Sequence, residues 1–204
     1  MGSPLRGWGM SKDTGHGHKF SAEGDFLERL EGPERMAAIP RDEILPRMGL
    51  SRTQTVVDLG AGSGYFSLPL AERVRRVVSI DVEPKMLGVL DQRIRLAGIS
   101  NIDLVRGEIT HIPIVDDSMD HVLAAFVYHE VDRPARLMFE SMRVLKPGGS
   151  VTVLDFQKKE TVIGPPINDR KTSAQVVRSA PDELRLESMH DADVYYQLEF
   201  RKQA

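Results

Sequence analysis

A short run of glycines directly after a β-branched segment constrains the fold of this chain more than any other feature. Residues 56–64 read Val-Val-Asp-Leu-Gly-Ala-Gly-Ser-Gly. Valines favour a buried strand, and glycines at alternate positions let the backbone turn sharply and approach a ligand closely. A helix is expected to follow from Tyr65, with its first N–H groups directed into the same corner. The pattern predicts a strand–loop–helix unit that binds a ligand at its bend.

A second acidic residue lies about one βα unit later in the sequence. Asp81 ends the apolar run that begins near Val77. A carboxylate at the end of such a strand can accept hydrogen bonds from both hydroxyls of a ribose. The pair of segments therefore predicts a cofactor of the nucleoside type.

The spacing of the glycines and one carboxylate indicate which nucleoside is bound. The dinucleotide fingerprint is G-x-G-x-x-G, but here the third glycine, Gly64, comes one residue early and Tyr65 takes the expected place. Asp58 would repel a pyrophosphate, whereas it favours a cationic ligand, directly or through water. The sequence therefore favours S-adenosylmethionine, and a nicotinamide oxidoreductase is the rival interpretation.

Four segments of the chain resemble the class I S-adenosylmethionine-dependent methyltransferases, in the broad group of small-molecule and quinone methylases. They are residues 56–71, 77–87, 101–131 and 143–156, which occur in the family's order. The resemblance implies a Rossmann-like α/β fold with a doubly wound, mostly parallel sheet of seven strands. It also implies S-adenosylmethionine as cofactor and S-adenosylhomocysteine as product.

The hydrophobic pattern predicts alternating strands and helices across the middle of the chain. Such alternation indicates a mostly parallel sheet with right-handed crossovers. Alternating apolar and polar residues at 184–187 and 194–200 predict a C-terminal antiparallel hairpin, and residues 147–149 predict a turn. The expected strands are 55–59, 77–80, 102–105, 120–126 and 150–156, and the expected helices are 65–75, 84–97, 134–145 and 173–179.

A chain of 204 residues suits one domain. Residues 1–19, which include His16 and His18, are rich in Gly, Ser, Lys and His and are expected to form a mobile arm. Residues 20–204 are expected to form the single domain, with a helical segment at 20–50, the cofactor-binding core at 51–156 and the hairpin region at 157–204. In the family, a piece like 20–50 is commonly a lid over the cofactor, although it could equally cover only the edge of the sheet.

The resemblance assigns cofactor contacts to individual positions. The cofactor loop corresponds to Asp58, Gly60, Ala61, Gly62 and Gly64, and Asp81 corresponds to the ribose ligand. Val82, Glu108 and Ile109 correspond to the adenine site, although Glu108 could instead be a surface residue. Ala125 and Phe126 are expected beside the methionine moiety.

Two titratable residues follow the fourth expected strand, where the methyl acceptor lies in this fold. His129 could remove a proton from the acceptor, because its pKa lies near neutral pH. It could also do no more than shape the pocket wall, and the same alternatives apply to Glu130.

Composition excludes several classes of function. The sequence has no cysteine, so disulfides, zinc–thiolate sites and thiol nucleophiles are excluded, and no metal site is expected. The net charge of −3 gives no drive toward nucleic acid. No apolar stretch approaches the roughly 20 residues of a membrane span, so a cytoplasmic location is expected and no membrane partner.

The leading hypothesis is in-line methyl transfer to an O, N or C atom of a small molecule. Residues 125–130 read Ala-Phe-Val-Tyr-His-Glu, which differs from the Asn/Asp-Pro-Pro-aromatic pattern of enzymes that methylate amino groups of nucleic acids. The alternative is a protein that binds the cofactor, as a sensor or scaffold, without turnover. The sequence does not indicate an oligomeric state.

Overall fold

The computed structural model of the chain describes residues 31–203. The expected arm at 1–19, with His16 and His18, and the first part of the expected helical segment lie outside the described residues.

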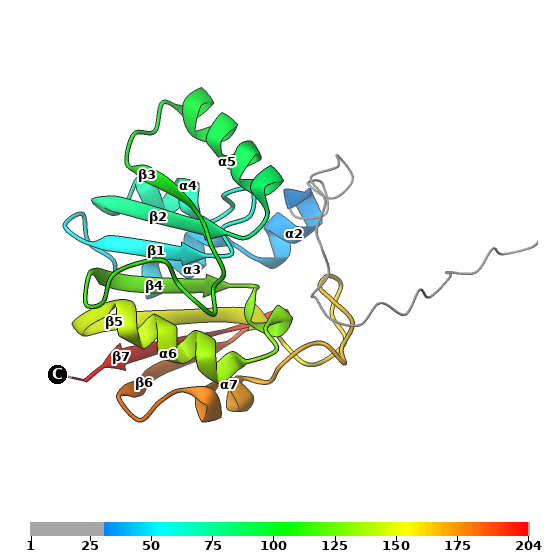
Figure 1. Cartoon of the computed structure of the whole chain (residues 1–204). Helices are drawn as coiled ribbons and strands as arrows, with labels where there is room; N and C mark the ends of the chain where they lie inside the picture. Colours follow the sequence, from blue (N-terminus) through cyan, green and yellow to red (C-terminus); the bar gives the residue numbers. More distant parts are fainter. Residues whose placement is uncertain (1–30, 204) are drawn as a thin grey trace, which may run out of the picture.

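A seven-stranded sheet forms the centre of the molecule (Figure 1), with the strand order β3-β2-β1-β4-β5-β7-β6. The first five strands in this order run parallel, and β7 pairs antiparallel with both β5 and β6. This topology confirms the doubly wound, mostly parallel α/β fold with a C-terminal antiparallel hairpin. The strands are β1 Thr55–Leu59, β2 Arg76–Asp81, β3 Ile102–Arg106, β4 Met119–Ala125, β5 Leu145–Phe156, β6 Leu184–Asp191 and β7 Tyr195–Lys202.

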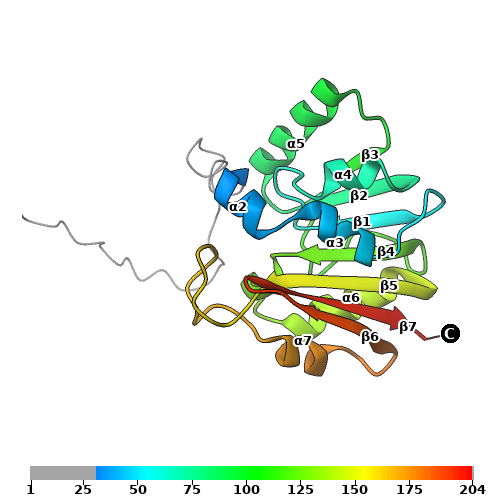
Figure 2. The same ribbon diagram turned by 180° about the vertical axis from the view of Figure 1, so that it is seen from behind.

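Helices pack on both faces of the sheet and enclose two apolar cores. On one face α6 and α7 lie in front of the strands in Figure 1, and Leu137 and Val176 are buried there. On the other face, seen in Figure 2, α3 and α4 contribute Ile44 and Leu70 to the second core. The helices are α2 Pro33–Ala38, α3 Arg41–Arg47, α4 Ser67–Ala71, α5 Pro84–Ala97, the 3-10 helix η1 Tyr128–Glu130, α6 Pro134–Val144 and α7 Ser173–Ser179.

The helix expected at 84–97 has the bounds that its sequence predicts. Pro84 occupies the first turn, and Gly98 ends the helix with a left-handed φ of 65°. Met86, Leu90 and Ile94 are buried as the apolar periodicity predicts. Leu96 is 80% exposed, because it follows the buried Ile94 by two residues and so lies about 200° further around the helix.

Several elements differ from their expected bounds by one or two residues, β6 extends four residues further than expected, and two other differences are larger in kind. The helix expected at 65–75 is the five-residue α4, because turns follow Gly64 and Pro69 supplies no N–H to continue the pattern. The turn expected at 147–149 is part of β5, as an irregularity in its pairing with β4, where Met119 pairs with Leu145 and His121 with Ser150. Gly148 adopts a φ of 75° in this segment, so the change of direction occurs within the strand.

The strand order reverses between β1 and β4, since the chain winds outward to β3 on one side and to β5 on the other. Loops that follow adjacent strands on the two sides of such a point diverge, and a crevice opens at the carboxyl ends of the strands. This places the segments after β1, β2 and β4 around one space.

Candidate cofactor and acceptor site

A cavity of about 640 Å³ opens at the carboxyl ends of β1, β2 and β4. Its lining includes every residue that the sequence assigns to a site except Gly64 and His129. The lining residues at the predicted positions are Asp58, Gly60, Ala61, Gly62, Asp81, Val82, Glu108, Ile109, Ala125, Phe126 and Glu130. Because these residues come from four segments of the sequence, the fold brings the predicted positions together.

The glycine loop after β1 requires glycine for both conformation and space. Gly60, Gly62 and Gly64 have φ values of 69°, 55° and 93°, which L side chains rarely adopt. A Cβ on Gly60 would lie 2.2 Å from Cγ1 of Val127, and one on Gly64 would lie 2.3 Å from Cδ1 of Leu90. Gly64 therefore allows α5 to pack against the loop, while Gly60 and Gly62 form the wall of the cavity.

Asp81 fixes the loop to the end of β2. Its Oδ2 accepts a hydrogen bond of 2.8 Å from the N–H of Gly62, and its Oδ1 accepts one of 2.8 Å from the N–H of Glu83. Burial raises the pKa of Asp81. Each carboxylate oxygen keeps a further lone pair, so the group can still accept hydrogen bonds from a ligand in the cavity.

Asp58 lies at the floor of the cavity and is 2% exposed. Its Oδ2 accepts a hydrogen bond of 2.6 Å from Oγ of Ser67, which in turn accepts one of 2.8 Å from Oγ of Ser79. Burial raises the pKa of Asp58 to about 7. A cationic ligand would favour the charged form of this group, because an opposite charge offsets the loss of solvation.

His129 and Glu130 lie in η1, directly after β4. The ring Nδ1 of His129 is 2.8 Å from Oδ1 of Asp155, and its backbone N–H donates to Oδ2 of Asp155 over 2.8 Å. The Nε2 of His129 lies 3.7 Å from Oε1 of Glu130. Hydrogen bonding and charge from Asp155 outweigh burial and raise the pKa of His129, whereas burial raises the pKa of Glu130 to about 7.

An aromatic cluster and a guanidinium group close the cavity beside β4. The ring of Phe126 lies 6.4 Å from that of Phe66 and 4.6 Å from that of Phe156. The guanidinium of Arg35, from α2, lies 5.1 Å from the centroid of Phe126. Arg35 lines the cavity, and its Nε has no hydrogen-bond partner among residues 31–203. Burial lowers the pKa of Arg35.

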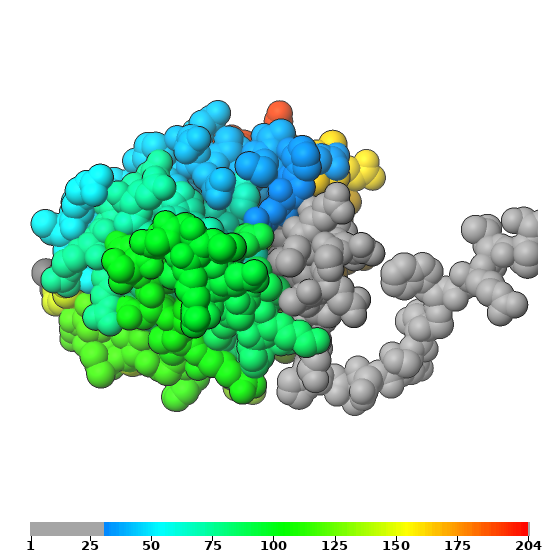
Figure 3. Space-filling model, turned by 90° about the horizontal axis from the view of Figure 1, so that it is seen from above, coloured from blue at the N-terminus to red at the C-terminus, as the bar shows by residue number. Residues whose placement is uncertain are grey.

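The segment that carries α2 and α3 is fastened to the glycine-loop side of the cavity. Nη1 of Arg41 donates to the carbonyl of Tyr65 over 2.9 Å, and the hydroxyl of Tyr65 donates to the carbonyl of Ile39 over 2.8 Å. In the space-filling view (Figure 3), the blue α2–α3 segment lies along the surface beside residues coloured cyan to green. This segment therefore borders the cavity, and its action as a lid stays a prediction.

The structure adds site residues that the sequence alone did not indicate. Arg35 precedes the glycine loop by more than twenty residues and belongs to no recognisable pattern. Asp155 ends β5, and only the parallel pairing of Ala125 with Leu154 shows that it lies next to η1. In the sequence, only the position of Asp155 near the end of a predicted strand could have indicated that it belongs to the site.

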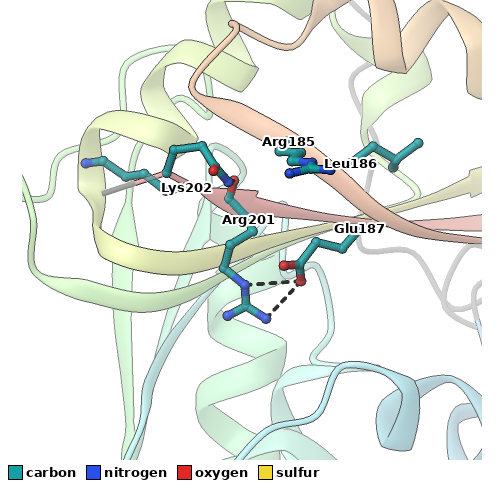
Figure 4. Close-up of a pocket in the computed structure, with 6 residues that line it drawn as sticks. Arg185, Leu186, Glu187, Arg201 and Lys202 are labelled. Carbon is teal, nitrogen blue, oxygen red and sulfur yellow. Dashed lines mark hydrogen bonds and ion pairs between the residues drawn. The ribbon is translucent and has the colours of Figure 1, made fainter.

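A second hollow lies at the far edge of the sheet, on the antiparallel strands β6 and β7 (Figure 4). Arg201 donates to Glu187 from two nitrogens, over 3.0 and 3.1 Å. Both side chains are more than 40% exposed, with values of 42% and 44%. Glu187 is thus paired with Arg201 within this surface, which contains none of the predicted site residues.

Residues 31–203 contain no group of three or more His, Asp or Glu side chains that could hold a metal ion. Among the same residues, no helix has the length and apolar character needed to cross a bilayer.

Comparison with known proteins identifies relatives of the central segment. Residues 57–153 match a family described as "Methyltransferase domain". A demethylmenaquinone methyltransferase of Clavibacter sepedonicus is 38% identical over 103 residues, which are 50% of this chain and 41% of that protein. An arsenite methyltransferase of Halobacterium salinarum is 30% identical over 105 residues, which are 50% of this chain and 27% of that protein.

Comparison of structures extends the likeness to most of the chain. The crystal structure of an S-adenosylmethionine-dependent methyltransferase from Aquifex aeolicus superposes with a TM-score of 0.81 at 23% identity, covering 89% of this chain and all of that one. The chain spans about half the length, or less, of the curated relatives that it matches. The central segment thus resembles the methyltransferase domain in sequence, and the structure has the fold of the class I S-adenosylmethionine-dependent methyltransferases.

Proposed function

We propose that this chain transfers a methyl group from S-adenosylmethionine to a small molecule. The observation that carries the proposal is the cavity at the switch point, where Asp58 and Asp81 flank a loop of left-handed glycines. A carboxylate at each of two adjacent strand ends suits a ligand with a ribose and a positively charged methionine end, and it disfavours a pyrophosphate.

The lining residues fit the parts of this cofactor in order along the cavity. Asp81 accepts the ribose hydroxyls, and Val82, Glu108 and Ile109 surround the adenine. Asp58 stabilises the positive charges of the methionine end, near Ala125 and Phe126. When bound, the sulfonium supplies an electrophilic methyl group. The chain contributes by aligning the acceptor with that group and by excluding water.

Arg35 completes this assignment from the α2 side. Its buried Nε lacks a partner among the described residues, and an α-carboxylate is an acceptor that a guanidinium binds well. We therefore include Arg35 among the proposed cofactor ligands. The α2–α3 segment would then act as a lid that binds to the cofactor as well as to Tyr65.

The proposed acceptor is a small molecule that is methylated on O, N or C. Its class stays open at this level, because the named relatives act on a quinone and on arsenite, which share no chemistry. A route through cysteine thiolates is not available to these residues, since the sequence has none. No observation favours a nucleic acid as acceptor.

Calorimetry with three ligands tests the cofactor assignment. We expect S-adenosylmethionine and S-adenosylhomocysteine to bind and NAD to give no heat, and we expect Asp81→Ala to abolish binding. The exchange Asp182→Asn, on the exposed surface, serves as the matched control. Tighter binding of NAD would instead support an oxidoreductase.

The second candidate function is cofactor binding without turnover. It requires the same Asp58 and Asp81, so binding alone does not distinguish it from catalysis. Release of S-adenosylhomocysteine with any small acceptor would exclude it, and binding with no release across O, N and C acceptors would favour it.

A further inference from the structure

Three side chains connect the interior of the sheet with the acceptor side of the cavity. Asp155 is 1% exposed at its side chain, His129 is 9% exposed and Glu130 is 36% exposed. The side chains therefore become more exposed from Asp155 through His129 to Glu130, which is also the order in which they contact one another. Of the three, Glu130 lines the cavity, so it is the group that an acceptor can touch.

The hydrogen bonds of Asp155 hold the imidazole of His129 in one orientation. One carboxylate oxygen is 2.8 Å from Nδ1 and the other accepts the backbone N–H of His129 over 2.8 Å. The ring also packs edge-on against Phe156, at 5.8 Å between centroids. Because the carboxylate of Asp155 accepts a hydrogen bond at Nδ1, that nitrogen carries a proton. The opposite nitrogen, Nε2, is then the one directed toward Glu130.

We propose that Glu130 is the general base for a hydroxyl acceptor and that Asp155 and His129 are its positioning residues, an inference that rests on the proposed methyl transfer. The acceptor oxygen forms a bond to the methyl carbon as the methyl–sulfur bond breaks. The electron pair of the broken bond stays on sulfur, and the hydroxyl proton passes to the carboxylate of Glu130. Protonated His129 stabilises that carboxylate before the transfer, across the 3.7 Å between Nε2 and Oε1.

The charges of the cavity indicate a neutral acceptor. The lining has six acidic side chains, Asp58, Asp81, Glu83, Glu108, Glu130 and Asp132, and two basic ones, Arg35 and Arg133. An anionic acceptor would be repelled by this majority. An acceptor that enters neutral must lose its proton during the reaction, and this is the step that a positioned base accelerates.

The walls beside Glu130 indicate the rest of the acceptor. Phe126, Val127 and Val131 line the cavity on either side of η1. Apolar walls on either side of Glu130 fit an apolar ring whose hydroxyl meets that carboxyl group. The acceptor class is therefore a phenol, whose hydroxyl is un-ionised at neutral pH.

Phenol and 4-nitrophenol test the base, because the two probes differ in whether the hydroxyl is already ionised near neutral pH. We expect the wild type to release S-adenosylhomocysteine with both probes, with a higher KM for 4-nitrophenol, because the acidic lining disfavours its ionised form. Glu130→Gln should lower kcat for phenol by about 100-fold or more, as expected for loss of a general base, and leave 4-nitrophenol roughly unchanged. The control Glu160→Gln, an exposed exchange of the same kind, should leave both rates unchanged.

The outcomes separate this inference from the proposed function. Equal loss on both probes, or loss on neither, would overturn the role of Glu130 as base. Binding of S-adenosylmethionine with no methylation of either probe by the wild type would overturn the phenol class. Failure to bind S-adenosylmethionine would overturn the proposed function itself.

The pH profile tests the positioning residues. The charged groups around Glu130 are His129 in η1, Asp155 in β5, Asp81 in β2 and, through His129, Arg35 in α2. Replacing His129 by Gln removes the positive charge beside Glu130, so Glu130 keeps its proton to a higher pH. The acidic limb of the pH profile of kcat for phenol should therefore shift to higher pH. An unmoved limb would contradict this role.

A titration by NMR tests Asp155 separately. His129→Gln assigns the imidazole resonances of His129. In Asp155→Asn we expect the pKa of His129 to fall, because the residue loses the charge and acceptor at Nδ1. The pKa should be unchanged in Asp182→Asn. If Asp155→Asn leaves the pKa of His129 where it was, Asp155 has only a packing role.

Discussion

Asp58 combines deep burial with a carboxyl group that is partly protonated at neutral pH. Its pKa is raised to about 7 by burial, and a bound cation would stabilise the charged form. Affinity for S-adenosylmethionine should therefore rise between pH 6 and pH 8, with release of a proton on binding at the lower pH. Calorimetry in two buffers of different ionisation enthalpy measures this release.

The exchange Asp58→Asn removes the titrating group. We expect weaker binding and an affinity that changes less over the same pH range, because only Glu130 still titrates in the cavity near neutral pH, while the control Asp182→Asn keeps the full pH dependence. If Asp58→Asn binds as tightly as the wild type at pH 8, Asp58 does not hold the methionine end of the cofactor.

Gly60 and Gly98 share a left-handed conformation but differ in surroundings. Their φ values are 69° and 65°. A Cβ on Gly98 meets nothing within 4 Å, whereas one on Gly60 meets Val127 at 2.2 Å. Gly98→Ala should lower the free energy of unfolding by about 1–2 kcal/mol, the cost of the backbone conformation. Gly60→Ala should cost a further 1–3 kcal/mol or so through overpacking, as measured by denaturant unfolding.

The added cost at Gly60 can be checked by removing its cause. In the background Val127→Ala, the clashing methyl groups are gone, so Gly60→Ala should cost roughly as little as Gly98→Ala. Equal cost of Gly60→Ala in both backgrounds would show that Val127 moves aside without penalty.

The loop between β5 and α7 is organised around one buried arginine. Arg170 is 4% exposed, and its guanidinium donates to the carbonyls of Gln157, Lys159 and Pro165 over 2.8–2.9 Å. It also lies 5.5 Å from the ring centroid of Phe156. A methionine cannot replace these donors, so Arg170→Met leaves buried carbonyl groups without partners.

Arg170→Met should therefore loosen residues 157–170 while β5 stays folded. We expect faster amide hydrogen exchange in this loop and cleavage within it by a low concentration of protease. Arg178→Met, an exposed exchange in α7, is the control and should change neither. Unchanged exchange in Arg170→Met would show that the loop is held by its other contacts.

At the scale of elements, local signals predicted the structure where they agreed with one another. Pro84 and Gly98 bracket α5 and an apolar stripe lies between them, so the helix has its expected bounds. In α4 the glycines and Pro69 compete with the helical pattern, and the helix is shorter than expected. The exposure of Leu96 in the last turn of α5 follows from the same helical period, which places it away from Met86, Leu90 and Ile94.

Some residues of the candidate site could likewise be predicted from the sequence, and others could not. Asp58 and Asp81 follow strands that the sequence identifies, and parallel pairing places strand ends side by side, so both positions could be predicted. Asp155 requires knowledge that β5 lies next to β4. Arg35 requires the path of α2 over Phe126 and Phe156, which depends on packing between segments far apart in the sequence.

Across the whole molecule, three carboxyl groups have raised pKa values and therefore change the stability in the same direction with pH. Burial raises the pKa values of Asp58, Glu130 and Glu199 to about 7. Between the unfolded pKa and the folded one, the folded state binds more protons than the unfolded state. The free energy of unfolding therefore falls as the pH rises from about 4.5 to about 7. His121, whose pKa burial lowers to about 3, acts in the opposite direction below pH 6.5.

Of these three residues, Glu199 lies outside the cavity. Its contribution to the pH dependence of the free energy of unfolding can therefore be measured without any effect on ligand binding. Its Oε2 accepts from Thr152 over 2.7 Å and its Oε1 from Gln197 over 2.9 Å. In Glu199→Gln, the amide oxygen can still accept the hydrogen bond from Gln197, and the amide nitrogen can donate to the hydroxyl of Thr152. Glu199→Gln should therefore raise the free energy of unfolding at pH 8 by on the order of 3 kcal/mol, the value of the pKa shift, and change it little at pH 4.5.

Denaturant unfolding of both proteins at the two pH values gives this difference, in which the contributions of His121, Asp58 and Glu130 cancel. Glu160→Gln, an exposed exchange outside the sheet, is the matched control and should show no such pH dependence. Equal effects of Glu199→Gln at pH 4.5 and pH 8 would mean that Glu199 keeps one ionisation state over this range. In that case the decline of stability toward alkaline pH would belong to the cavity residues alone.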